Sequence, residues 1–387
     1  MKISILTPDL SNNCFGRAYL LAKILQKNYE VEIIGPIFRK KIWEPLSDIN
    51  DVTYKSIKIG RIPKSYWQVS TILKNISGDI VYASKPLFSS FGIGLIEKLL
   101  NKKTLILDVD DWQMGFRNEQ YKNFAPANRI KYLIYSMFQF YETTSYWNNL
   151  IGEMLALRAD EITVSNTFLK EKFGGTIVWH CRNTDVFDPQ LFNRDSFRSI
   201  YAIPKNKKVV MFLGTPNVHK GLDDLIEAVK LTNNLNIVLS IVGIGNDPYS
   251  KKLEKLGKAK LGNRFLPFRL QPFEKVPEFL TIADVVVIPQ RENFATIGQV
   301  PAKVFDAMAM AKPVIATNVS DLPIILKDCG WIVEPENIGQ LAESIQHVIN
   351  SPEEAEDTGS RARQKCIENY SWNAMENILT PLFRKYV

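Results

Sequence analysis

A lysine and a glycine open a predicted helix in FLGTPNVHKGLDDLIEAVK, residues 212–230. The preceding strand ends at Gly214, a turn passes through Pro216, and Lys220-Gly221 begin the helix. Backbone N–H groups at a helix start and a nearby lysine attract anions, so the diphosphate of a nucleotide could bind there. An ordinary strand-to-helix turn is the alternative, and a glycine and a lysine alone do not exclude it.

A second candidate site lies in ADVVVIPQRENFATIGQVPAKVFDAMAMAKPVIAT, residues 283–317. This segment predicts a buried strand, a long polar loop, a helix over residues 301–310 with proline at its start, and another buried strand. Open α/β sheets bind ligands at the carboxyl ends of their strands, which is where the loop lies. Asp306 in the helix could accept hydrogen bonds from a ribose. A solvated helix carboxylate is the alternative interpretation.

The first half of the chain has paired acids at a predicted strand end in LDVDDW, residues 107–112. Asp110 and Asp111 could accept hydrogen bonds from the hydroxyl groups of a ligand. Paired acids also cap helices, and that role is favoured for Asp108. His180 ends another predicted strand, where a structural histidine is the commoner outcome.

Strands and helices alternate along the chain, which predicts an α/β fold with mainly parallel sheets covered on both faces. Short apolar runs bounded by turn residues predict strands over residues 3–6, 31–34, 79–83, 104–107, 161–164, 176–179, 209–214, 237–242, 264–267, 285–288, 314–317 and 331–333. A chain of 387 residues is longer than one core usually supports. We therefore expect a domain over residues 1–190, a linker over 191–208, a second domain over 209–370 and a final helix over 371–387.

Composition is that of an ordinary globular protein, with 45% hydrophobic and 23% charged residues. The N-terminus opens as a strand without the apolar core of a signal peptide, and no apolar stretch is long enough for a membrane span, so a cytoplasmic location is expected. The net charge of +7 suits an anionic partner such as a nucleotide diphosphate, an anionic membrane or nucleic acid. Nucleic acid is the weakest of these, because the basic residues form no dense run. Four cysteines without a C-x-x-C pair signal neither a zinc site nor a disulfide framework.

In order and spacing, the motifs resemble those of the group 1 (family 4) retaining glycosyltransferases with the GT-B fold. The resemblance spans nearly the whole chain and is more specific than any single motif. It is carried by the Gly16 loop after the first strand, ADEITVSNTF at 159–168, HCRNTDVFDP at 180–189, LGTPNVHKGLDDLIEA at 213–228, VPEFLTIADVVVIP at 276–289 and PAKVFDAMAMAKPVIAT at 301–317.

The resemblance implies two Rossmann-like domains that face each other across a cleft, with the final helix crossing back to the first. The second domain would hold a nucleotide-sugar donor and the first an acceptor. Lys220 matches the family's diphosphate-binding lysine, Asp306 the second acid of its Glu-x-seven-Glu motif, and Gly16 the glycine that approaches the donor phosphates. The implied donor-binding residues are Gly16, Gly214, Thr215, Lys220, Gly221, Arg291, Lys303 and Asp306.

Three positions depart from the family pattern. Gly298 stands eight residues before Asp306, where the family has its first glutamate, and Glu292 in the longer loop is the candidate replacement. The ribose-binding acid at 306 is aspartate rather than glutamate. Thr215 stands where the family has a diphosphate-binding arginine, and Arg291 or Lys303 could supply that cation. The residues implied to act in catalysis are Lys220, Glu292 and Asp111. With the family's chemistry, Asp110 and Asp111 would orient the acceptor hydroxyl or contact the donor sugar.

A segment rich in aromatic residues, 128–157, has apolar residues on all sides, as buried helices do. The family packs a helix beneath its first sheet at this place, so burial is favoured. The alternative is contact with lipid or a lipid-linked acceptor, assisted by Arg129 and Lys131.

The resemblance implies a metal-independent transfer that retains anomeric configuration and uses no cofactor. Its partners would be a nucleotide-sugar donor, a glycan or lipid-linked acceptor and an anionic membrane, but not nucleic acid. Surface polysaccharide or glycolipid assembly at the inner face of the cell membrane is the expected setting. Two alternatives stay open: a catalytically silent nucleotide-sugar or glycan-binding protein, and a sugar-nucleotide epimerase.

Overall fold

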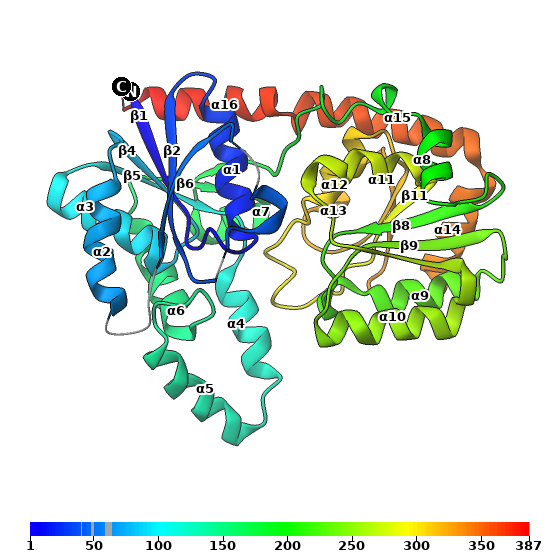
Figure 1. Cartoon of the computed structure of the whole chain (residues 1–387), viewed down its shortest axis with the longest axis horizontal. Coiled ribbons are helices and arrows are strands. Elements are labelled where there is room, and N and C mark those ends of the chain that lie inside the picture. The colour runs from blue at the N-terminus through cyan, green and yellow to red at the C-terminus, as the bar shows by residue number, and fades with distance from the viewer. Residues whose placement is uncertain (40, 48–49, 59–63, 387) are drawn as a thin grey trace. The chain divides into compact units, whose positions relative to one another are not determined.

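The computed structural model describes residues 1–39, 41–47, 50–58 and 64–386. Contacts within the chain divide it into two compact units (Figure 1). Unit 1 comprises Met1–His180, Ile297–Val300 and Met375–Val387, and unit 2 comprises Cys181–Thr296 and Pro301–Ala374. Two short segments from the second half of the sequence therefore belong to unit 1.

Unit 1 is built on a seven-stranded parallel sheet with the strand order β3-β2-β1-β4-β5-β6-β7. The register is regular at the centre, where Ile5 of β1 lies beside Ile33 of β2 and Tyr82 of β4. The strands are β1 (Lys2–Leu6), β2 (Glu30–Ile37), β3 (Thr53–Lys58), β4 (Ile80–Ser84), β5 (Thr104–Val109), β6 (Glu161–Val164) and β7 (Thr176–Ile177). Its helices are α1 (Cys14–Leu25), α2 (Lys64–Asn75), α3 (Ile93–Asn101), α4 (Gln113–Lys122), α5 (Pro126–Phe138), α6 (Tyr146–Leu155) and α7 (Thr167–Phe173).

Strand β3 is the element of this sheet that the sequence did not predict. It is an edge strand with the sequence TYKSIK, and none of its residues is fully buried. Because an edge strand needs few apolar residues, it lacks the continuous apolar run that identified the other strands.

Unit 2 is built on a six-stranded parallel sheet with the order β10-β9-β8-β11-β12-β13. Its strands are β8 (Lys208–Leu213), β9 (Ile237–Ile244), β10 (Phe265–Arg269), β11 (Val285–Ile288), β12 (Val314–Thr317) and β13 (Trp331–Val333). Its helices are α8 (Arg194–Ile200), α9 (Leu222–Leu231), α10 (Pro248–Leu261), α11 (Val276–Ile282), α12 (Lys303–Ala309), α13 (Leu322–Ile325), α14 (Ile338–Asn350) and α15 (Pro352–Asn369). Strand β11 and the first three residues of β12 are apolar because both faces of the sheet are covered.

The stretch 191–208, expected as a linker, is folded as part of unit 2. It contains α8, whose Arg198 is buried and donates to the carbonyl of Ile282 and the carboxylate of Asp284. By contacts, unit 2 begins at Cys181 rather than beyond this stretch. A buried arginine that bonds across the chain explains why a polar, basic segment is nevertheless structured.

The last helix, α16 (Trp372–Arg384), joins unit 1 from Met375 onward, as predicted for a helix that returns to the first half of the chain. Its apolar stripe is buried at Met375, Leu379, Leu382 and Phe383. The Phe383 ring meets the Tyr82 ring edge to face, with centroids 5.4 Å apart. Lys27 and Asn28 also donate to the Glu376 carboxylate, at 2.8 and 2.7 Å.

The prediction of a buried helix over 128–157 is wrong. The segment folds as two helices, α5 and α6, and its buried side chains are mainly polar. Ser136 and Ser145 bond each other, and Ser145 caps α6 by accepting from the Asn148 N–H. Because these polar contacts face inward, large apolar side chains face solvent, at Ile130, Ile134, Tyr135, Met137, Phe138, Ile151, Met154, Leu155 and Leu157.

Candidate active site

Lys220 lies in a tight turn between β8 and α9 in unit 2. Gly221, which caps α9, has a φ of 62°, and a Cβ on it would lie 1.9 Å from the Pro289 carbonyl oxygen. Glycine is therefore required at this helix start. The turn brings the Lys220 Nζ within 2.5 Å of the Thr215 carbonyl oxygen, so two of the residues proposed from sequence are adjacent.

Lys303 approaches the same turn from α12. A Cβ on Gly214 would lie 3.1 Å from the Lys303 Nζ, so the ammonium group sits directly against the end of β8. It also lies 4.6 Å from the centre of the Phe212 ring. Burial and the nearby charge of Lys220 lower the pKa of Lys303 well below its usual range. Two ammonium groups thus converge beside the turn, an arrangement that a bound anion would stabilise.

Arg291, the other candidate cation, is engaged elsewhere. Its Nε and NH2 groups donate to the two carboxylate oxygens of Asp224, at 2.8 and 2.6 Å, and its pKa is raised by this pairing. Glu336 lies 3.7 Å away. The charge of Arg291 is therefore balanced by acids at the start of α9 and after β13.

Asp306 is buried in α12 and paired with Arg182. The Arg182 Nε donates to the Asp306 carboxylate, while its NH1 donates to the Cys181 carbonyl at 2.7 Å. Sequence reasoning gave Arg182 no role, although it stands in one of the quoted motifs. In the sequence, Arg182 stands among short polar residues that follow a predicted strand. This pattern alone does not identify Asp306 as its partner.

Glu292 is exposed on the loop after β11. Thr296 holds the loop by donating to the Arg291 carbonyl oxygen at 2.7 Å and accepting from the Asn293 N–H at 2.9 Å. Gln290 is buried, and its carbonyl accepts from the Thr317 hydroxyl at 2.6 Å. The loop backbone is therefore fixed, while the Glu292 carboxylate is left accessible to a ligand.

The missing acid at position 298 has a steric explanation. Gly298 belongs to unit 1, where its carbonyl accepts from the Trp112 N–H at 3.0 Å. A Cβ on Gly298 would lie 2.4 Å from the Trp112 Cβ and 3.2 Å from the Phe168 ring. In this arrangement no side chain fits at position 298. The next residue, Gln299, donates to the Asp111 carboxylate at 2.9 Å.

Asp110 and Asp111 share a buried lysine that the sequence analysis missed. Lys85, directly after β4, lies 2.5 Å from an Asp110 oxygen and 2.8 Å from an Asp111 oxygen. Its φ of 67° is unusual for lysine and marks a backbone held by surrounding structure. Burial raises the pKa of Asp110 to about 6 despite the opposing charge of Lys85. For Asp111 burial also raises the pKa, but the charge and hydrogen bond of Lys85 outweigh it, so the net shift is downward.

The expectation that Asp108 caps a helix is wrong. Asp108 is fully buried in β5, where its carboxylate accepts from Arg17 of α1 at 2.9 and 2.8 Å and from Thr163 at 2.8 Å. Gly16, expected in a loop, lies in the first turn of α1, and a Cβ on it would lie 3.3 Å from the Trp43 ring. His180 closes the first stretch of unit 1, and its charge contributes to lowering the pKa of Asp111.

The chain is similar to known proteins in both sequence and fold. Residues 193–365 match the family model described as glycosyl transferases group 1. This part of the chain is therefore similar to the group 1 glycosyltransferases. Apart from residues 297–300, the matched stretch lies in unit 2, and it includes both the Lys220 turn and the Asp306 helix.

Two curated relatives each match about half of the chain. The alpha-D-kanosaminyltransferase of Streptomyces kanamyceticus is 24% identical over 195 residues, which cover 50% of this chain and 49% of that protein. The alpha-maltose-1-phosphate synthase of Mycolicibacterium smegmatis is 27% identical over 198 residues, 48% of this chain and 49% of that protein. The chain thus spans about half the length of these relatives.

The fold extends the likeness to the whole chain. HepE from Anabaena, solved in complex with UDP-glucose, superposes with a TM-score of 0.78 at 15% identity, covering 100% of both chains. Together with the two parallel sheets, this confirms the predicted GT-B class of fold.

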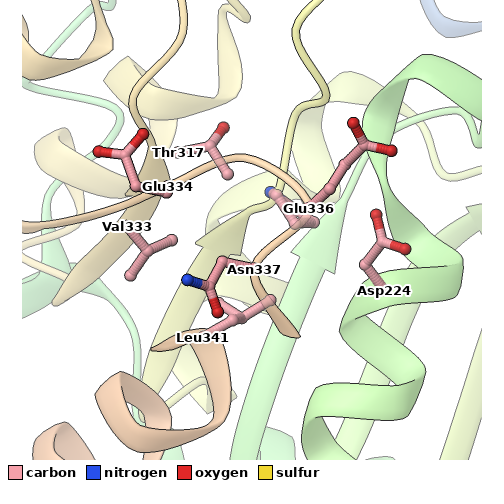
Figure 2. A pocket seen from close by; sticks show the side chains of 8 residues that line it. Asp224, Thr317, Val333, Glu334, Glu336, Asn337 and Leu341 are labelled. Carbon is pink, nitrogen blue, oxygen red and sulfur yellow. The ribbon is translucent and has the colours of Figure 1, made fainter. Parts of the chain in front are cut away.

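Unit 2 also has a small pocket at the ends of three strands (Figure 2). Pro289, Thr317 and Val333 contribute the strand ends, and carboxylates surround them; the complete lining is Asp224, Pro289, Thr317, Val333, Glu334, Glu336, Asn337 and Leu341. Two of these acids, Asp224 and Glu336, are the partners of Arg291. Across the described ranges, no group of three or more histidine, cysteine or acidic side chains is placed to hold a metal ion. None of the helices in those ranges is long and apolar enough to cross a membrane.

Proposed function

We propose that this chain transfers a sugar from a nucleotide-sugar donor to an acceptor hydroxyl, with retention of anomeric configuration and without a metal ion. In this proposal unit 2 binds the donor and unit 1 the acceptor. The observation that carries it is the convergence of Lys220 and Lys303 on the turn after β8, where the pKa of Lys303 is depressed. The positive charges of these two lysines repel each other at a helix start, and a bound diphosphate would relieve that repulsion.

The donor contacts follow from the same geometry. Lys220 and Lys303 neutralise the diphosphate, which lies beside the backbone of Gly214, Thr215 and Gly221. The N–H groups of the two glycines already donate to the carbonyls of Val242 and Val218, so the glycines serve by letting the phosphates approach closely. Arg182 holds Asp306 through one carboxylate oxygen, and a carboxylate has further lone pairs with which to accept a ribose hydroxyl. The accessible Glu292 carboxylate contacts hydroxyls of the donor sugar. The backbone of Gly16 is proposed to approach the donor phosphates, as in the family.

The reaction needs no covalent enzyme intermediate. The bond between the sugar C1 and the diphosphate oxygen breaks, and the acceptor oxygen bonds to C1 on the same face. The acceptor proton passes to the departing diphosphate. Lys220, Lys303 and the N–H groups at the start of α9 stabilise the negative charge that develops on this leaving group. Asp111, held by Lys85 and Gln299, orients the acceptor hydroxyl.

The acceptor in this proposal is a glycan or a lipid-linked glycan of a surface polysaccharide or glycolipid pathway. The chain then works in the cytoplasm at the inner face of the cell membrane, in peripheral contact with anionic lipid. The net charge of +7 supports such a contact.

Thermal stabilisation by candidate donors tests the donor site directly. A ligand that binds only the folded state raises the melting temperature. UDP-glucose, the sugar nucleotide of the HepE complex, is the first donor to test, followed by other UDP-, GDP- and dTDP-sugars. We expect one donor to stabilise the wild type and to lose its effect in a Lys220→Ala variant. If the whole panel left the melting temperature unchanged, the donor site would be wrongly assigned.

One alternative is favoured by a specific observation. The family's first acid is missing at Gly298, and the contact with Trp112 leaves no room to restore it, which a catalytically silent nucleotide-sugar-binding protein would tolerate. Slow hydrolysis of a stabilising donor without acceptor, abolished by Lys220→Ala, would decide for the enzyme. Release of an epimerised sugar instead would decide for a sugar-nucleotide epimerase.

A further inference from the structure

Helix α5 of unit 1 exposes large apolar side chains along one face. Ile130, Ile134 and Phe138, each four residues from the next, are 64%, 52% and 73% exposed. Residues at this spacing lie on the same side of a helix. Tyr135 and Met137 beside them are 60% and 61% exposed. Five large side chains on a single short helix form an apolar surface larger than isolated exposed residues explain.

The opposite face of α5 fastens it to unit 1. Ser136 is buried against Ser145, and the Leu133 carbonyl accepts from the Trp147 indole at 2.9 Å. Tyr132 packs its ring against Phe124 and Tyr146. The apolar face is therefore presented by a helix held in place, not by a loosely packed segment.

The position of α5 makes this face accessible. In Figure 1, α4, α5 and α6 form an excursion from the sheet of unit 1, and α5 is the part drawn farthest from the strands. A flat partner can approach such a tip without meeting the sheet.

The charged residues of α5 and its immediate flanks are basic, and the nearest acids along the chain are Glu119 and Glu142. Residues 120–141 contain Lys122, Arg129 and Lys131 and no acidic residue. Lys122 and Lys131 are exposed, and Arg129 is fixed by donating to the carbonyls of Phe124 and Lys122. Apolar and aromatic side chains combined with cations are typical of helices that lie in the interface of an anionic bilayer.

We propose that α5 is the surface through which this chain docks on an anionic lipid bilayer. Ile130, Ile134 and Phe138 enter the boundary between headgroups and acyl chains, while Lys131 contacts lipid phosphates. A second copy of the chain fits this face less well, because a two-fold contact would bring the cations of two helices together. This inference rests on the proposed function, in which docking brings unit 1 to a lipid-linked acceptor.

Vesicle binding of the full-length chain tests the proposal. Vesicles with about 30% phosphatidylglycerol in phosphatidylcholine are compared with phosphatidylcholine alone, by flotation at low and high salt. We expect binding to the anionic vesicles that weakens with salt. The double variant Ile134→Ser, Phe138→Ser should reduce partitioning by at least about tenfold, and Lys131→Gln by about fivefold. A matched control, Leu231→Ser with Leu235→Ser, changes two exposed leucines of unit 2 and should bind as the wild type.

Each outcome decides the proposal. All substituted side chains are exposed, so the variants should keep the wild-type melting temperature. Equal vesicle binding by wild type and double variant would overturn the assignment of α5, and so would binding that ignores lipid charge. Self-association that the double variant abolishes, without vesicle binding, would assign the face to a second copy of the chain. Donor-induced stabilisation measures the proposed transfer function separately, so either proposal can fail while the other stands.

Discussion

At the residue scale, the two lysines beside β8 can be told apart from Arg291. Lys220 and Lys303 converge on the turn that holds Gly214, whereas Arg291 is committed to Asp224. Removing one charge stabiliser from a preorganised site costs about 3 kcal/mol in the transition state. We therefore expect Lys220→Ala and Lys303→Ala each to lower transfer by about two orders of magnitude. Arg291→Ala should have a smaller effect on turnover.

Lys230→Ala is the matched control for this prediction. Lys230 is an exposed lysine on α9, the helix that Lys220 precedes, and its loss should leave both donor binding and turnover unchanged. Steady-state transfer with the stabilising donor is the measurement. Full turnover in correctly folded Lys220→Ala protein would remove the donor site from this turn.

Asp110 gives the protein a specific pH dependence. Its pKa is raised to about 6 in the folded state, above the usual value of an aspartate. As the pH rises, the unfolded chain therefore releases the Asp110 proton at a lower pH than the folded chain does. Its contribution to stability is therefore present at low pH and is lost as the pH rises from about 4 to about 6. The Asp110→Asn variant has no carboxyl group at this position, so its free energy of unfolding should lack this decrease.

The measurement is the free energy of unfolding of both proteins between pH 4 and pH 7. The difference, Asp110→Asn minus wild type, should grow by up to about 1.4 kcal/mol per unit up to about pH 6 and then level off. A difference that stayed constant across this range would mean that the Asp110 carboxyl keeps an ordinary pKa next to Lys85.

At the element scale, the loop after β11 is constrained where it meets Trp112. A methyl group at position 298 would overlap the Trp112 Cβ, whose position is set by the backbone and does not change when the side chain rotates. Overpacking of this kind costs about 1–3 kcal/mol. Gly298→Ala should therefore lower the melting temperature, and Gly298→Glu should weaken transfer rather than restore the family's acid.

Gly339→Ala supplies the matched comparison. Gly339 lies in α14 with only the Asn337 side chain near its Cβ position, at 3.7 Å, so an added methyl group fits. Thermal unfolding of the two alanine variants compares a crowded with an open glycine. Equal melting temperatures would show that the 297–300 segment moves away from Trp112 without cost.

At the scale of the whole molecule, the last helix completes unit 1. Met375, Leu379, Leu382 and Phe383 of α16 are buried, and Phe383 packs on Tyr82 at the centre of the first sheet. Burial of each such side chain contributes about 2 kcal/mol, which together exceeds half the stability of an ordinary domain. Deleting residues 371–387 should therefore prevent unit 1 from folding stably.

Single substitutions test whether α16 stabilises unit 1 through the packing of its side chains rather than through the length of the chain. Phe383→Ala should cost about 3–5 kcal/mol of unfolding free energy, while Thr380→Ala on the same helix should cost little. Chemical unfolding monitors both. A truncated chain that unfolded with the same midpoint and cooperativity as the full chain would contradict the role given to α16.

The proposed mechanism also predicts that activity does not depend on a metal ion. Lys220 and Lys303 supply positive charge at the leaving group, and the second series of strands carries no D-x-D motif at a strand end. Transfer should continue at its full rate in excess chelator. If activity were lost in chelator and restored by magnesium or manganese, Lys220 and Lys303 alone would not neutralise the negative charge of the leaving diphosphate.

The sequence alone was sufficient for those features that depend on neighbouring residues. Apolar runs bounded by turn residues predicted most strands of both sheets, because a buried parallel strand must be apolar over its own length. The left-handed conformation of Gly221 in the Lys220-Gly221 turn is also a local feature, although the Pro289 carbonyl that excludes a side chain there comes from a distant segment. The order of these segments also indicated the family and the GT-B class of fold.

Only the tertiary structure decided which charged groups meet. Arg17 and Asp108 are separated by 91 residues, and Arg182 and Asp306 by 124, so no local pattern could pair them. The same applies to Lys85 beside Asp110 and Asp111, and to the Trp112 contact that leaves no space at Gly298. For α5 the sequence predicted burial from apolar content, but the inward-facing serines and asparagines decided which side faces water. Packing between distant segments sets burial and charge pairing, and this information is absent from any short stretch of sequence.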